Sequence, residues 1–122
     1  RCRCQLVLVA HTNHPQELND ATARSLACLK HCHITLLNQS VLLRSVNEDA
    51  TTLAELSKKL FAQGVLPYYL HLTDYVAGTE HFFIDDDEAR KIYAQLQQLL
   101  PGYLLPKLVR EQPGQASKTL MY

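Results

Sequence analysis

The 122-residue sequence has no tryptophan, one methionine, no excess of charge of either sign and no long apolar run. No apolar stretch approaches the roughly 18–20 residues that span a bilayer, so a membrane protein is not expected. Twelve acidic residues balance twelve basic ones, and the basic residues are scattered, which argues against a nucleic-acid partner. We expect a cytoplasmic protein, because its four cysteines are predicted to be reduced thiols.

The sequence also has neither a starting methionine nor the layout of a signal peptide. We therefore expect it to be the later part of a longer protein whose N-terminal part is missing here. Its length suits about one small domain, residues 1–122, and it contains no low-complexity stretch or linker.

Cysteine is present at only four positions, Cys2, Cys4, Cys28 and Cys32, and no C-x-x-C pair occurs among them. Metal knuckles need such pairs, so no metal site is predicted. A disulfide framework is disfavoured because the rest of the chain shows regular α and β patterns. Cys28 and Cys32 have helical i, i+4 spacing, which predicts small, buried, reduced side chains.

Short apolar runs alternate with amphipathic segments about every thirty residues. Strands are predicted at 5–12, 33–38, 65–72 and 103–111, and helices at 13–32, 48–64 and 85–102. This order, β-α-β-α-β-α-β, predicts an α/β fold with parallel strands and helical crossovers. It fits a small open sheet or part of a (β/α) barrel of the TIM type. Pro106 predicts that the last strand is irregular or at an edge.

Local signals set the expected helix ends. Pro15 suits the start of the first helix. Thr52 and Glu55 match a capping box for the second helix, and Gly64 suits its end. Gly102 is the expected terminator of the third helix.

Polar residues follow each predicted strand, where the carboxyl ends of parallel strands place chemistry. They are His11, Asn13 and His14; Asn38 and Gln39; His71 and Asp74; and Arg110 and Glu111. Each also has a plainer explanation, such as a turn, a helix start or a bond to loop backbone. The acidic run 85–88 is expected to cap a helix and face solvent, with no chemistry. Tyr68 and Tyr69 are adjacent on a strand, so their side chains are expected to face opposite ways.

Four blocks carry a resemblance to a known family: "HTNHPQE", "LLNQSVLLRSVNED", "LPYYLHLTDYVAGTEHF" and the closing "SKT". Over essentially its whole length the chain resembles the carboxyl-terminal part of lysine 2,3-aminomutases, which are radical S-adenosylmethionine enzymes. Within that family it is similar to the elongation factor P (R)-β-lysylation proteins. The resemblance implies a partial (β/α) barrel that uses a [4Fe-4S] cluster, S-adenosylmethionine and pyridoxal 5′-phosphate to convert L-lysine to (R)-β-lysine.

The resemblance also implies roles for particular residues. Lys118, in the loop and tail 112–122, matches the lysine that carries pyridoxal 5′-phosphate. Asp74 and Glu111 match carboxylates that bind the side-chain ammonium of substrate lysine. His11 and Gln39 match positions near S-adenosylmethionine, with Asn13 and His14 as supporting residues.

The family's cluster motif, C-x3-C-x2-C, is absent from this sequence. The resemblance therefore implies that the cluster ligands lie upstream and that these 122 residues alone are inactive. Exposed sheet edges in such a part would favour a homodimer. Two other interpretations stay open: a Schiff-base aldolase-like barrel that uses Lys118 without pyridoxal 5′-phosphate, and a non-catalytic α/β module that binds a small ligand.

Overall fold

The computed structural model describes residues 5–73, 78, 80–110 and 119–121. Its strands are β1 (Val7–His11), β2 (Thr35–Leu42), β3 (Leu66–Leu72), β4 (Lys107–Arg110) and β5 (Thr119–Leu120). Its α-helices are α1 (Asp20–His31), α2 (Ala50–Ala62) and α3 (Asp86–Leu99). Three short 3-10 helices lie between them, η1 (Pro15–Glu17), η2 (Glu80–Phe82) and η3 (Gly102–Leu104).

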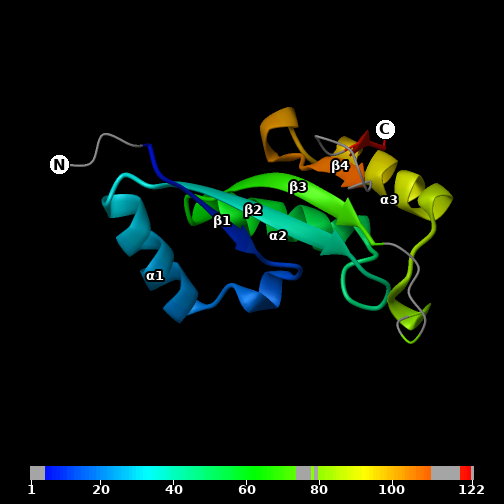
Figure 1. Ribbon diagram of the computed structural model, residues 1–122, viewed down its shortest axis with the longest axis horizontal. Helices are drawn as coiled ribbons and strands as arrows, with labels where there is room; N and C mark the ends of the chain where they lie inside the picture. The colour runs from blue at the N-terminus through cyan, green and yellow to red at the C-terminus, as the bar shows by residue number, and fades with distance from the viewer. Residues whose placement is uncertain (1–4, 74–77, 79, 111–118, 122) are drawn as a thin grey trace.

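The sheet has the order β1-β2-β3-β4-β5, in which the first four strands run parallel (Figure 1). The predicted α/β fold and its β-α-β-α-β-α-β order are confirmed. Each crossover leads to the next strand in the same direction. Leu36 and Leu42 lie on the same face of β2, and the two buried clusters to which they belong include residues of all three helices, so the helices cover that one face. A singly wound sheet of this kind is compatible with part of a (β/α) barrel. The antiparallel β5, which pairs with β4, was not predicted.

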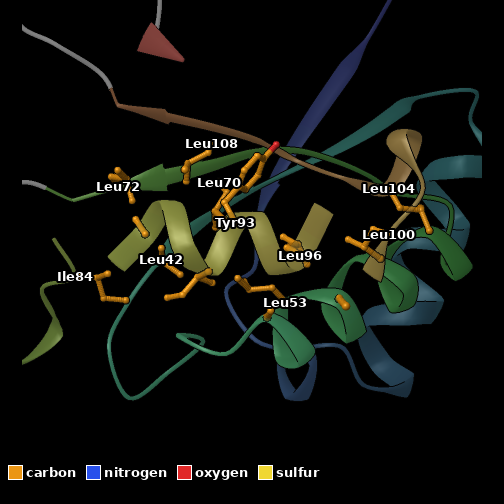
Figure 2. Close-up of a cluster of buried hydrophobic side chains, with 14 residues drawn as sticks. Leu42, Leu53, Leu70, Leu72, Ile84, Tyr93, Leu96, Leu100, Leu104 and Leu108 are labelled. Carbon is orange, nitrogen blue, oxygen red and sulfur yellow. The ribbon is translucent and has the colours of Figure 1, made fainter. Parts of the chain in front are cut away.

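The main core lies between the sheet and helices α2 and α3 (Figure 2). Leu42, Leu70 and Leu108 reach it from three neighbouring strands, and Leu53 and Leu96 meet them from the helices. A second buried cluster joins α1 to α2, with Leu26 the one buried residue of α1. Leu53, Leu56 and Leu60 form the buried stripe of α2.

A register shift between β2 and β3 decides which side chains reach this core. Asn38 pairs with Pro67, whereas the next residue, Gln39, pairs with Tyr69, so Tyr68 is an extra residue in β3. A bulge of this kind changes the alternation of faces along the strand. Beyond it Leu70 faces the helices and is 1 % exposed.

The first helical segment differs from its prediction because it is divided. Pro15 begins η1, whereas α1 starts at Asp20 with Asn19 as its N-cap. Asn19 Oδ1 accepts from Thr22 N at 2.9 Å, and Thr22 Oγ1 accepts from Asn19 N at 2.9 Å. This reciprocal cap is a stronger helix start than the proline.

The capping residue at the start of α2 was also predicted wrongly, whereas the glycine at its end was predicted correctly. Asp49 is the N-cap, so Thr52 lies inside the first turn. Gly64 has φ +82° and forms a Schellman motif: its N–H donates to Phe61 O and that of Val65 to Leu60 O.

The predicted end of α3 at Gly102 is wrong. The helix ends at Leu99, just before Pro101, which cannot continue it, and Gly102 instead begins η3. Pro106 precedes β4, which lies inside the sheet between β3 and β5 and not at its edge.

The predicted burial of two cysteines is also wrong. Cys28 and Cys32 are free thiols with exposed side chains, because the buried side of α1 is the one that carries Leu26. Cys2 and Cys4 lie outside the described residues.

Candidate functional site

The face of the sheet opposite the helices, called here the open face, carries a polar cross-strand row. His11 pairs with Gln39, Gln39 with Tyr69, and Tyr69 with Lys107. Residues that pair directly across strands place their side chains on the same face, so these four lie side by side. The structure thus brings together His11 and Gln39, two residues singled out from the sequence.

This row crosses the strands at different heights. It meets β1 at its last residue, His11, and β4 at its first residue, Lys107. Such a stagger between neighbouring strands accompanies strand tilt in barrels. The prediction that Gln39 follows the second strand is wrong, because β2 continues to Leu42.

Tyr68 and Tyr69 do not face opposite ways, contrary to the prediction. Their ring centroids lie 4.0 Å apart at an interplanar angle of 33°. The bulge explains this, since Tyr68 is the extra residue of β3 and the usual alternation fails there. The hydrogen bond to Tyr68, partial burial and the charge of Tyr68 together raise the pKa of Tyr69 above its ordinary value of 10.0.

His71 lies on the same open face, two residues after Tyr69 and nearer the carboxyl end of β3. It pairs with Val41 on one side and Val109 on the other. Its ring makes an edge contact with Tyr69, with 5.7 Å between centroids. The open face therefore combines two imidazoles, an amide, phenols and an amine.

Asn38 has the opposite orientation to its neighbour Gln39. It is 1 % exposed, and its Nδ2 donates to Thr12 O at 3.2 Å and to Ser40 Oγ at 3.0 Å. Ser40 Oγ also donates to Thr12 O at 2.7 Å. Asn38 consequently ties β2 to the end of β1 on the helix side.

Asn13 and His14 are held by local hydrogen bonds. Asn13 Oδ1 accepts from Val41 N at 2.9 Å. His14 is the N-cap of η1, and its Nδ1 accepts from Gln16 N at 3.1 Å. Both side chains fix the loop that follows β1.

The acidic start of α3 makes ion pairs that its sequence did not predict. Asp86 accepts a charge-assisted hydrogen bond from Arg110 in β4, and Glu88 accepts one from Arg44 in the loop after β2. Arg44 Nε also donates to Phe83 O at 3.1 Å. The expected capping is confirmed, because Asp85 Oδ1 accepts from Glu88 N at 2.8 Å. The expectation that the run otherwise only faces solvent is wrong, because the carboxylates of Asp86 and Glu88 hold neighbouring segments.

Three residues with implied roles, Asp74, Glu111 and Lys118, lie outside the described residues. Within the described part of the chain, no group of three or more His, Cys, Asp or Glu side chains could hold a metal ion. No helix in that same part is long and apolar enough to cross a membrane.

Fold and open face together define a class: an α/β protein with parallel strands joined by helices and a row of polar residues on the face opposite the helices. No protein-family model matches the chain. Individual relatives do match, among them several L-lysine 2,3-aminomutases. That of Haemophilus influenzae is 54% identical over 118 residues, 97% of this chain and 35% of the relative.

The L-lysine 2,3-aminomutase of Escherichia coli is 52% identical over 119 residues, 98% of this chain and 35% of the relative. That of Clostridium subterminale is 37% identical over 112 residues, 92% of this chain and 27% of the relative. The chain is therefore homologous to L-lysine 2,3-aminomutase. The chain spans 35% of the length of the first two relatives and 27% of that of the third.

Proposed function

We propose that this chain is the carboxyl-terminal part of an L-lysine 2,3-aminomutase that produces (R)-β-lysine for the modification of elongation factor P in the cytoplasm. The observation that carries the proposal is identity of 54% and 52%, over nearly the whole chain, to two enzymes of that name. The chain spans about 35% of those relatives. Our proposal therefore includes that catalysis needs the longer protein and that these 122 residues alone are inactive.

The residues on the open face fit part of the family's cofactor set. His11 and Gln39 are neighbours in one cross-strand row, and both offer polar ring or amide atoms for the S-adenosyl group. The described residues do not offer a thiolate set for an iron–sulfur cluster, so we assign the cluster to the rest of the protein. The cofactors supply the radical and the electron sink, and this chain supplies position and charge.

Lys118 is the residue that we assign to pyridoxal 5′-phosphate, because a lysine amine can condense reversibly with an aldehyde. Asp74 and Glu111 are assigned to the distant ammonium of substrate lysine. Two carboxylates in a partly dry site bind an ammonium more strongly than a surface pair does. They also reject amino acids without that ammonium, because the carboxylates would then be left unpaired.

The test compares Lys118→Ala with Lys91→Ala, an exposed lysine on α3, in the full-length protein. We expect Lys118→Ala to abolish covalent attachment of pyridoxal 5′-phosphate, measured by mass spectrometry after borohydride reduction, and Lys91→Ala to leave it unchanged. Retained attachment in Lys118→Ala would contradict the proposal. An adduct at Lys118 with a carbonyl substrate, formed without the cofactor, would favour the aldolase-like alternative.

A further inference from the structure

Helix α3 contacts both strands of the hairpin formed by β4 and β5. Asp86, the first residue of α3, pairs with Arg110 at the end of β4. One turn later, Arg90 Nε donates to Met121 O, just after β5, at 3.1 Å. The Arg110 side chain is only 17% exposed, so its pair is better shielded from water than an ordinary surface pair.

The hairpin itself has very few ladder contacts. Val109 pairs with Leu120 and Arg110 with Thr119, and Met121 N donates to Leu108 O at 2.9 Å. A two-residue strand is at best marginal by itself, so contacts from outside the ladder have to stabilise it. The two bonds from α3 are such contacts.

The sequence gives this hairpin a functional consequence. Glu111 directly follows Arg110, and Lys118 directly precedes Thr119. Both residues are therefore one peptide bond away from the last ladder pair, Arg110–Thr119. Whatever fixes that pair therefore fixes the two described residues to which Glu111 and Lys118 are bonded.

We infer that Asp86 and Arg90 are positioning residues, which hold the two ends of segment 111–118 and thereby set the reach of Lys118. The inference rests on the proposed function, in which Lys118 carries pyridoxal 5′-phosphate. Neither residue touches the reacting atoms, and each acts through the backbone of the hairpin. Opening of the hairpin would displace the amine without altering its chemistry, so the apparent affinity for the cofactor falls while the bond to it can still form.

The test uses Asp86→Asn and Arg90→Gln in the full-length protein. Amide exchange of a peptide that contains Leu120 and Met121 is expected to accelerate about tenfold, the effect of losing a partly shielded charge-assisted hydrogen bond. The cofactor concentration that gives half-maximal attachment to Lys118 should rise severalfold, read by borohydride reduction and mass spectrometry. Asp86→Glu, which keeps the charge, should restore both values.

Two exposed residues provide matched controls. Asp20→Asn removes the equivalent first-turn carboxylate from α1, and Lys91→Gln removes a cation next to Arg90. Both should leave exchange and attachment as in the unmodified protein. Unchanged exchange in Asp86→Asn and Arg90→Gln would overturn the inference, as would faster exchange without any change in attachment. If the unmodified protein carries no pyridoxal 5′-phosphate on Lys118, the proposed function fails, and the inference fails with it only as regards Lys118.

Discussion

At the scale of single residues, the buried amide of Asn47 determines how the loop after β2 joins the first strand. The residue is 1 % exposed. Its Nδ2 donates to Asn13 O at 2.7 Å and to Val41 O at 2.9 Å, while its Oδ1 accepts from Leu43 N at 2.8 Å. With Asn13 Oδ1 bound to Val41 N, the two asparagines link two loops across the carboxyl end of the sheet.

Asn47→Ala should therefore destabilise the protein by about 2–4 kcal/mol, because three hydrogen bonds are lost and buried backbone groups remain unpaired. Chemical denaturation followed by circular dichroism measures this. Gln97→Ala, on the exposed side of α3, is the control and should change the unfolding free energy by less than about 0.5 kcal/mol. A cost for Asn47→Ala no larger than that of the control would show that the backbone holds the loop without this side chain.

Residue type alone predicted that polar side chains gather near the carboxyl ends of the strands, but not which face each one occupies. Alternation assigns faces only if the strand's extent and register are known. β2 continues past Asn38 and Gln39, and the bulge places Tyr68 beside Tyr69. The ion pair between Asp86 and Arg110, which are 24 positions apart, could likewise not be predicted because it depends on tertiary structure.

At the scale of elements, two helices end in the same hydrogen-bonded motif with different residues at its left-handed position. Gly64 occupies it after α2 with φ +82°, and His33 occupies it after α1 with φ +62°. In both cases the backbone N–H of the second residue after the C-cap donates to a carbonyl of the last helical turn: Val65 N to Leu60 O, and Ile34 N to Leu29 O. Only glycine adopts this conformation without steric cost.

The motif predicts that substitutions at the two helix ends change the free energy of unfolding in opposite directions. Gly64→Ala should cost about 1–2 kcal/mol from backbone strain and not from a clash, because the atoms nearest to the added Cβ belong to the Lys30 side chain and lie at 3.5 Å or more. His33→Gly should stabilise by about 0.5–1 kcal/mol. Gly102→Ala, where an added Cβ meets nothing within 4 Å and φ is ordinary, is the control in the same urea titrations. Equal effects at Gly64 and Gly102 would contradict the argument.

Helix and strand identities were predictable because apolar periodicity follows from burial on one side, whereas helix starts were not. Asp49 and Thr52 are both acceptable capping residues for α2, and tertiary context decides that Asp49 is the N-cap. For α1, Asn19 is the N-cap, although Pro15 is also an acceptable start. The glycine cap at Gly64 was predictable because few residues compete for a left-handed position.

At the scale of the whole molecule, β1 is an edge strand with an uncovered apolar surface. Among the described residues it pairs only with β2 (Figure 1). Leu6, Val7 and Leu8 are 54%, 52% and 41% exposed. The relatives are about three times as long as this chain, so a protein of their length has ample sequence to cover such an edge.

A protein consisting of these 122 residues should therefore self-associate through β1, because an exposed apolar edge templates further strand pairing. Val7→Lys places a charge on that edge and should weaken association about tenfold or more, measured by light scattering over a concentration series. Phe61→Lys changes a side chain of similar exposure, 47%, on α2 and away from the edge, so association should persist. A monomer at all concentrations, or equal effects of the two substitutions, would refute association through β1. If association is lost only with Val7→Lys, β1 is the surface through which these 122 residues associate.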